Sequence, residues 1–314
     1  MLDTKPFEKK SITCAVIVTY NPDLIIFSRQ LNSLKGQVNS IVIVDNNSSN
    51  IDEIKYQIGG FINSFDLEMH LICNKNNVGL GRAQNEGIKF AESKAVTHII
   101  LFDQDSILDF GFVEGLLYSE NQLLKQGIKI GAIGPTYYNE NTGEIYPISK
   151  YYGPFIERIL PSDKPIEASF LIASGCLISL DVIKHVGYMN EDLFIDYIDV
   201  EWSFRAKSLG YSLFASPISK MKHTIGDNRT SILGRSISVH SPLRRYYLYR
   251  NSIYMIKDSK ILLGYKIREI AFNAFRFVVF LILSNERRKY FKYSISGFID
   301  GFKGIKGKCP HVYN

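Results

Sequence analysis

The first hundred residues alternate between short β-branched runs and longer segments whose apolar residues recur at helical spacing. The runs of strand length are CAVIVTY (14–20), SIVIVDN (40–46), HLIC (70–73) and THIILFD (97–103). Between them lie DLIIFSRQLNSLKGQ (23–37) and GRAQNEGIKFAES (81–93), which have the spacing of amphipathic helices. Strands that alternate with helices imply a mostly parallel sheet that is covered by helices on both faces. We therefore predict an α/β fold.

The pattern changes twice further along the chain. Residues 131–165 form a loose Gly-, Pro- and Tyr-rich stretch with short strands, and ASFLIASGCLISL (168–180) follows as one buried strand-like run. EDLFIDYIDVEWSFRAKSLGY (191–211) predicts a loop that enters a helix ending near Gly210, and the chain from Arg244 to Lys308 is helical, basic and aromatic. We expect a catalytic domain over residues 1–235 and a helical, basic-amphipathic extension over residues 236–314.

Polar residues gather where the predicted strands end. They are Thr19, Tyr20 and Asn21; Asp45, Asn46 and Asn47; Asn74 to Asn77; and Asp103 and Asp105. Ligands of parallel α/β sheets bind outside the carboxyl ends of the strands, so these groups are expected to meet in one crevice. Each one alone is an ordinary turn residue.

The pair Asp103 and Asp105 admits three interpretations. It is a polar turn with two solvated carboxylates, a glycosidase-like acid and nucleophile pair, or a site for a divalent cation. The glycosidase interpretation requires carboxylates that flank a sugar from opposite sides. Mg²⁺ and Mn²⁺ prefer carboxylate oxygens and complete their coordination with phosphates, which fits the third interpretation.

Three other stretches contain candidate functional residues. NVGLGRAQNEG (77–87) is either a tight turn before a helix or an anion site that uses helix-terminal amides and Arg82; Gln84 breaks the dinucleotide fingerprint. Asp196, Asp199 and Glu201 are either helix caps or include a general base. His223 is either a structural surface histidine or a further metal or diphosphate ligand.

Composition limits the class of protein. Of 314 residues, 46% are hydrophobic and the net charge is only +6, so a sizeable core is expected and nucleic acid is not an expected partner. Four scattered cysteines fit neither a zinc site nor a disulfide framework. No apolar signal core precedes the first strand, and the longest apolar run (270–283) is shorter than a membrane span. We expect a cytoplasmic protein.

The C-terminal extension has an apolar stripe at helical spacing, bordered by basic residues. Its members are Ile267, Ile270, Ala271, Ala274, Phe275, Val278 and Ile282. Such a stripe packs on the catalytic core, forms a homodimer interface, or lies on the anionic inner face of the cell membrane. The third use predicts a peripheral membrane protein.

Five motifs occur together and in order: VIVTYNPD, IVIVDNNSS, NNVGLGRAQNEG, FDQDS and FIDYIDVEWSFRAKSLGY. Over roughly residues 12–227 the chain resembles the inverting, family-2 glycosyltransferases with the GT-A fold. Within that family, LFDQDS, DYIDVEW, HTIGD and RRYYLYRN look like bacterial rhamnosyltransferases of polysaccharide and O-antigen assembly.

The resemblance implies roles for individual residues. Donor-binding residues would be Thr19, Tyr20, Asn21, Asp45, Asn46, Arg82, Asp103 and Gln104. The family's DXD motif falls on Asp103 and Asp105, with Asp105 as the direct ligand of Mg²⁺ or Mn²⁺, and His223 is an additional candidate ligand. Asp199 matches the catalytic base. Many relatives have consecutive acids there, whereas Ile198 precedes Asp199 here, and Asp196 is a candidate for the missing charge.

The resemblance also implies a reaction. A sugar, expected to be L-rhamnose from dTDP-L-rhamnose, would be transferred with inversion to a lipid-linked saccharide acceptor, with help from a divalent cation. Two rival functions are a nucleotidyltransferase and a non-catalytic nucleotide-sugar binding protein. The first would carry a glycine- and basic-rich loop after the first strand, where this chain has TYNPD, and the second would not need Asp199.

Overall fold

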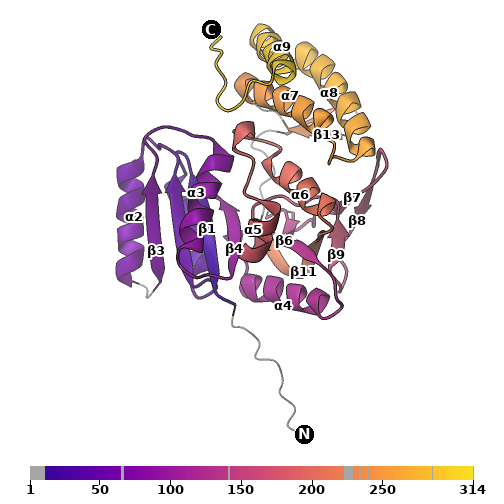
Figure 1. The fold of residues 1–314 in the computed structure, drawn as a ribbon. Helices are drawn as coiled ribbons and strands as arrows, with labels where there is room; N and C mark the ends of the chain where they lie inside the picture. Colours follow the sequence, from indigo (N-terminus) through magenta and orange to yellow (C-terminus); the bar gives the residue numbers. More distant parts are fainter. Residues whose placement is uncertain are drawn as a thin grey trace.

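The structure is a computed structural model that describes residues 11–64, 67–140, 142–222, 229–232, 235–238, 241–284 and 286–313. A central sheet with helices on both faces makes up most of the molecule, and a group of C-terminal helices lies at the end opposite the N-terminus (Figure 1). The predicted α/β fold is confirmed.

The N-terminal half alternates strand and helix as the sequence predicts. Its elements are β1 (Thr13–Thr19), α1 (Leu24–Leu34), β2 (Ser40–Asp45), α2 (Ile51–Ser64), β3 (Glu68–Cys73), α3 (Leu80–Glu92) and β4 (His98–Asp103). Strands β1, β2, β3 and β4 pair in parallel. Along β1, alternate residues face opposite sides: Val16 packs with α3, α5 and α6, and Ile17 packs with α1, α2 and α4. Both faces are covered by helices, which explains why these strands are apolar throughout.

The second half completes the sheet with strands of mixed direction. Its elements are β5 (Ile107–Leu108), α4 (Phe112–Leu124), β6 (Ile130–Tyr138), β7 (Ile148–Tyr152), β8 (Phe155–Ile159), β9 (Ile166–Ala168), β10 (Cys176–Ser179), α5 (Leu180–Val186), η1 (Glu191–Leu193), α6 (Ile198–Ser208) and β11 (Ser212–Lys222). Among the described residues the sheet runs β3-β2-β1-β4-β10-β6-β11-β5, with β9 paired to β11. Strand β10 is antiparallel to both of its neighbours.

One predicted strand is wrong. The run 168–180 is not a single strand but the end of β9, a loop, and then β10. Most of its apolar side chains are buried, although Ile172 in the loop is 36% exposed, so the hydrophobic pattern alone could not separate this loop from a strand. Gly175, with φ +83°, gives the chain a conformation that a side chain rarely adopts, and its N–H donates to the Leu101 carbonyl at 2.7 Å.

The predicted helical C-terminal region is confirmed. After the short strands β12 (Arg229–Ile232) and β13 (Arg235–Ser238) come α7 (Pro242–Lys257), α8 (Leu263–Leu283) and α9 (Arg287–Lys303). Helix α7 begins where Ser241 caps the Arg244 amide and proline occupies the first turn. The proposed domain boundary at residue 235 stays a prediction, because residues 233–234 and 239–240 lie outside the described part of the chain.

No helix in the described ranges combines the length and the apolar character that crossing a bilayer requires.

Candidate active site

The carboxyl ends of β2, β1 and β4 lie side by side, as the sequence predicts. Thr19 is paired in register with Asp45, and Val18 with Asp103. The Thr19 hydroxyl donates to the Asp45 carboxylate at 2.9 Å, and the Ser48 amide donates to its other oxygen at 2.9 Å. Asp45 is 1% exposed. It therefore fixes the floor of the crevice, with its charge satisfied by the protein.

Asn46 is also used by the protein. Its side-chain oxygen accepts from the Val78 amide at 2.9 Å, and its nitrogen donates to the Asn77 side chain at 3.1 Å. The amides of Gly79 and Leu80 donate in turn to Asn77 and to the Phe194 carbonyl. Because these amides at the start of α3 already have acceptors, the structure favours the tight-turn interpretation of residues 77–87 over an anion site.

Arg82 lies on the exposed side of the first turn of α3. Its guanidinium pairs with Glu86, one helical turn along, at 3.4 Å, and 57% of its side chain is exposed. A surface pair of this kind is weak and leaves the guanidinium available to a ligand.

Gln104 joins the ends of β1 and β4. Its side-chain oxygen accepts from the Tyr20 amide at 2.7 Å, and its nitrogen donates to the Tyr20 carbonyl at 3.3 Å. The Tyr20 side chain is half exposed. Next to it, Asn21 has φ +48° and its side-chain oxygen accepts from Ser49 at 2.7 Å. These contacts fix the backbone of Tyr20 beside the ends of β1 and β4 and leave its ring half exposed.

Asp103 and Asp105 stand on a tight turn directly after β4. Asp103 is half-buried and Asp105 is exposed. In the described part of the chain neither carboxylate accepts a hydrogen bond. Burial, together with the negative charges of Asp105 and Asp199, raises the pKa of Asp103 to about 7, and Arg244 opposes the shift.

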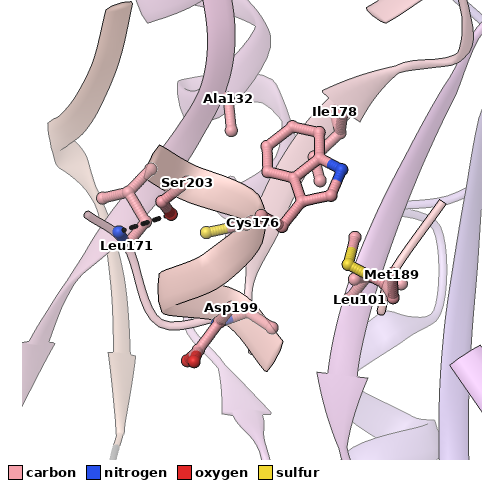
Figure 2. Close-up of a pocket in the computed structure, with 10 residues that line it drawn as sticks. Leu101, Ala132, Leu171, Cys176, Ile178, Met189, Asp199 and Ser203 are labelled. Carbon is pink, nitrogen blue, oxygen red and sulfur yellow. Dashed lines mark hydrogen bonds between the residues drawn. The ribbon is translucent and has the colours of Figure 1, made fainter. Parts of the chain in front are cut away.

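Asp199 stands in the first turn of α6. Its carboxylate accepts from the Val200 amide at 2.8 Å and from the Ala173 amide at 3.3 Å. It borders a small pocket (Figure 2), in which Asp199 lies at one edge, below Cys176 and Ser203 in the view. The pocket is mainly apolar, and its lining residues are Leu101, Ala132, Leu171, Ala173, Cys176, Ile178, Met189, Asp199, Trp202 and Ser203.

This environment changes the acidity of Asp199. Burial raises its pKa to about 6, and the Asp196 charge adds to the rise, whereas the hydrogen bonds from Val200 and Ala173 oppose it. A carboxylate with a pKa near 6 is a stronger base than a solvated aspartate and is still ionised at neutral pH.

The other two acids of this stretch have partners. Glu201 pairs with Arg205 at 2.9 Å, and Arg205 also donates to two carbonyls of the preceding loop. Asp196 receives the guanidinium of Arg244 on both oxygens, at 2.9 to 3.2 Å. Only Asp199 combines burial with a carboxylate that is held by backbone amides alone.

The loop between β9 and β10 is the part of the site that the sequence did not reveal. The Ser174 hydroxyl accepts from the Asp103 amide at 3.1 Å and lies 2.6 Å from the Ser106 hydroxyl. Its neighbour Ala173 donates to Asp199. This loop therefore fixes the backbone of one aspartate and the carboxylate of the other. The only sequence signal was Gly175 within an otherwise strand-like run.

The residues present fit a divalent cation. Within the described residues neither the Asp103 nor the Asp105 carboxylate accepts a hydrogen bond, and burial together with the charges of Asp105 and Asp199 raises the pKa of Asp103 in spite of Arg244. Two carboxylates are the usual protein contribution to a Mg²⁺ site that is completed by water and phosphate. No group of three potential ligands occurs in the described ranges, and His223 lies outside the described residues.

Comparisons with known proteins agree with this geometry. Residues 14–187 match the sequence model of glycosyl transferase family 2. Over 298 residues the chain is 34% identical to the dTDP-rhamnosyl transferase RfbF of Shigella flexneri. The aligned region covers 93% of this chain and 96% of that protein.

Two solved structures resemble the fold. One is S. aureus TarS 1–349 in complex with UDP-GlcNAc, with a TM-score of 0.57, 14% identity, and coverage of 94% of this chain and 81% of that chain. The other is GalNAc-T7 with UDP, GalNAc and Mn²⁺, with a TM-score of 0.57, 15% identity, and coverage of 95% and 57%. The present chain thus spans little more than half the length of the GalNAc-T7 chain. At these identities the likeness concerns the fold alone.

The raised pKa of Asp103 has a consequence for stability. An unfolded aspartate ionises near pH 4, so between about pH 4 and pH 7 the folded chain binds more protons than the unfolded chain. Its contribution to stability is present below pH 4 and is lost as the pH rises to 7. With chelator present, Asp103→Asn should therefore melt about 5 °C above the native protein at pH 8 and at the same temperature at pH 4.

Calorimetric melting across this pH range measures the effect. The exposed Asp163 provides the matched control, because Asp163→Asn should show no gain at pH 8. An Asp103→Asn protein that is less stable than the native protein at pH 8 would contradict the prediction.

Proposed function

The chain belongs to glycosyl transferase family 2, and from that premise we propose that it transfers L-rhamnose from dTDP-L-rhamnose to a lipid-linked saccharide acceptor with inversion. It is a glycosyltransferase. The rhamnosyl donor is supported by the 34% identity to a dTDP-rhamnosyl transferase over nearly the whole of both chains. The observation that carries the mechanism is the Asp199 carboxylate, which two backbone amides hold beside a mainly apolar pocket and whose charge raises the pKa of Asp103.

Asp199 is the proposed general base. Its carboxylate takes the proton from an acceptor hydroxyl while that oxygen forms a bond to the anomeric carbon of the donor. The bond from this carbon to the diphosphate breaks on the opposite side, and the nucleoside diphosphate leaves with the electron pair. A single displacement of this kind inverts the configuration, so a β-linked donor gives an α-linked product.

The donor would lie along the carboxyl ends of β1, β2 and β4. Tyr20, with its half-exposed ring, and Arg82, with its exposed guanidinium, are the proposed contacts to the nucleotide. Thr19, Asp45 and Asn46 are largely occupied with one another and with neighbouring turns, so we assign them to shaping this pocket. Asn21 and Gln104 hold the backbone on either side of Tyr20.

A divalent cation is the proposed cofactor, and Asp103 and Asp105 would hold it. When bound, it would supply Lewis-acid stabilisation of the charge on the leaving diphosphate. GalNAc-T7, which shares the fold, has been solved with UDP and Mn²⁺. The uncompensated charge of the two aspartates is the local reason to expect a cation here.

The general base is tested with Asp199→Asn, which keeps the shape of the side chain but cannot accept the proton. We expect the turnover number for transfer to fall by roughly 10²- to 10⁴-fold with unchanged donor affinity. Rate assays and calorimetric donor titrations measure the two effects. Asp196→Asn is the comparison, because Asp196 is occupied by Arg244. An inactive Asp196→Asn beside an active Asp199→Asn would move the base by about one helical turn.

The donor and the cation are tested together by titration. Native protein with Mn²⁺ should bind dTDP-L-rhamnose at least about tenfold more tightly than UDP-glucose or UDP-galactose, which corresponds to roughly 1.4 kcal/mol. Chelator, or the variant Asp105→Asn, should remove most transfer, because charge stabilisation by a cation is worth several kcal/mol. Asp163→Asn again serves as the control carboxylate.

Two results would show separately whether the proposed donor or the proposed cation is wrong. Tighter binding of a UDP-sugar would refute the rhamnosyl donor and leave the transferase mechanism standing. Full transfer in excess chelator would refute the cation and leave the donor assignment standing.

The surface of α8 supports a place for the enzyme at a membrane. The whole predicted stripe is exposed in the structure, where Ile267, Ile270, Val278 and Ile282 are each more than half exposed. These side chains recur every three or four residues, so they lie on one side of α8. An exposed apolar face of this kind marks an interaction surface.

The charge near this face favours an anionic bilayer. Residues 242–313 contain fifteen Lys and Arg but only four Asp and Glu, whereas the whole chain has a net charge of +6. The rest of the chain is therefore net negative. Arg287 and Arg288, at the start of α9, are exposed next to the end of α8. Each basic residue near an anionic surface contributes roughly 1 kcal/mol, so the two effects together give reversible binding.

Membrane binding is tested by co-sedimentation with vesicles of phosphatidylserine and phosphatidylcholine. We expect the native protein to pellet at low salt and to be released at high salt. The double variant Ile267→Glu/Val278→Glu should stay in the supernatant, because it places charge on the apolar face. Ile25→Glu is the matched control, since Ile25 is 75% exposed on α1, far along the chain from α8. Native protein that stays in the supernatant at low salt would instead indicate a face between two copies of the chain, which sedimentation equilibrium would detect.

A further inference from the structure

The segment that leads into α6 has an unfavourable backbone conformation. Phe194, Asp196 and Tyr197 each have φ +64°, a region that side chains with a Cβ atom rarely adopt. Three such residues within four positions persist only where the surroundings determine the conformation. Asp199 follows two residues later, so this loop sets the position from which its side chain projects.

Helix α7 supplies buried hydrogen bonds to this loop. The Asn251 side chain donates to the carbonyls of Leu193, Ile195 and Asp196 at 2.9, 2.8 and 3.2 Å. The neighbouring Arg250 donates to the Leu193 carbonyl at 2.8 Å. Both side chains are 0% exposed.

Arg250 also ties the C-terminal tail to the same loop. Its guanidinium donates to the carbonyls of Asp192 and Gly307, and the Gly307 amide donates to the Asp192 carbonyl at 2.8 Å. Lys306 adds an ion pair with the Asp192 carboxylate at 2.7 Å.

Further contacts from α7 on one side and α3 on the other hold the loop. The Tyr247 ring stacks on Phe194 with the centroids 5.0 Å apart, and Arg244 grips the Asp196 carboxylate with two nitrogens. On the other side, the Leu80 amide donates to the Phe194 carbonyl at 2.6 Å. Gly79 leaves the space for this approach, since a Cβ there would meet the Phe194 ring at 2.6 Å.

Packing of α7 against the core would not by itself require these buried polar contacts. A buried guanidinium and a buried amide are costly unless every donor has an acceptor, and apolar side chains would join a helix to the core at lower cost. Here most of the acceptors are carbonyls of one strained loop, and the others are the Gly307 carbonyl and the Asn251 side chain. We propose that Asn251 and Arg250, assisted by Arg244, are positioning residues that hold this loop so that the Asp199 carboxylate faces the acceptor hydroxyl. The inference rests on the proposed role of Asp199 as the base.

On this proposal the helical extension is part of the catalytic machinery. The fully buried side chains of Asn251 and Arg250 act through Asp199 rather than on the substrates. Loss of their hydrogen bonds should therefore lower the turnover number and leave donor binding unchanged, since the donor contacts come from β1, β2, β4 and α3.

The test is a double-mutant cycle of Asn251→Ala and Asp199→Asn, measured as transfer rate with calorimetric donor affinity. In the native background Asn251→Ala should lower the turnover number by roughly 10- to 100-fold with donor KM and Kd unchanged. In the Asp199→Asn background it should have less than about a threefold effect, because the group it positions is gone. A general structural defect would reduce the rate equally in both backgrounds.

Ser252→Ala is the matched control. Ser252 is the next residue, equally buried, and its hydroxyl bonds only to the Tyr249 carbonyl within α7. We expect it to leave the turnover number unchanged. If Asn251→Ala does not fold, Arg244→Gln replaces it in the cycle, since Arg244 has a side chain that is 44% exposed and grips the same loop.

The outcomes are distinct. Native turnover in both Asn251→Ala and Arg244→Gln, or equal losses in the two backgrounds, would overturn the positioning role and leave Asp199 as the base. An active Asp199→Asn protein would instead refute the proposed base itself, whatever the variants of α7 do.

Discussion

The organising constraint of this molecule is the accumulation of negative charge where its strands end. Burial raises the pKa of both Asp103 and Asp199. The charges of Asp105 and Asp199 add to the rise at Asp103, and the charge of Asp196 adds to the rise at Asp199. Such charge is unfavourable for folding and useful for a reaction that releases a diphosphate and deprotonates a hydroxyl. The loop at Ser174 holds the backbone of Asp103 and the carboxylate of Asp199, and we propose that the contacts of α7 with residues 192–197 also position Asp199.

The sequence predicts the parallel part of the fold because its signals are local. The strands that end at Thr19, Asp45 and Asp103 are continuous apolar runs, and the helices between them have regular spacing. The candidate residues that directly follow a strand can also be predicted, because the end of the strand is visible in the local sequence. The single long strand expected at residues 168–180 fails for a physical reason: the loop that interrupts it is mostly apolar and has the composition of a strand.

The contacts that orient the candidate base could not be predicted from sequence in this way. Arg250 and Asn251 lie about fifty residues after Asp199, in a helix whose aromatic and basic composition indicated only a helical extension. Their acceptors are backbone carbonyls, which have no sequence signature. The pairing of Gln104 with the Tyr20 backbone is hidden for the same reason. Contacts between side chains of opposite charge can be inferred from the sequence. Contacts between a side chain and backbone carbonyls can be identified only when the course of the backbone is known.

The position of β11 has a consequence for the order of folding. The family match ends at residue 187, yet β6 lies in the middle of the sheet and takes β11, residues 212–222, as its parallel partner. Its other partner, β10, is antiparallel and also arrives late in the chain. During synthesis the N-terminal strands can pair as they emerge, but the second half of the sheet must wait for about eighty more residues after β6. Such non-local pairing slows folding and keeps an apolar edge exposed in the meantime. The nascent chain is therefore vulnerable to aggregation in the interval between the synthesis of β6 and that of β11.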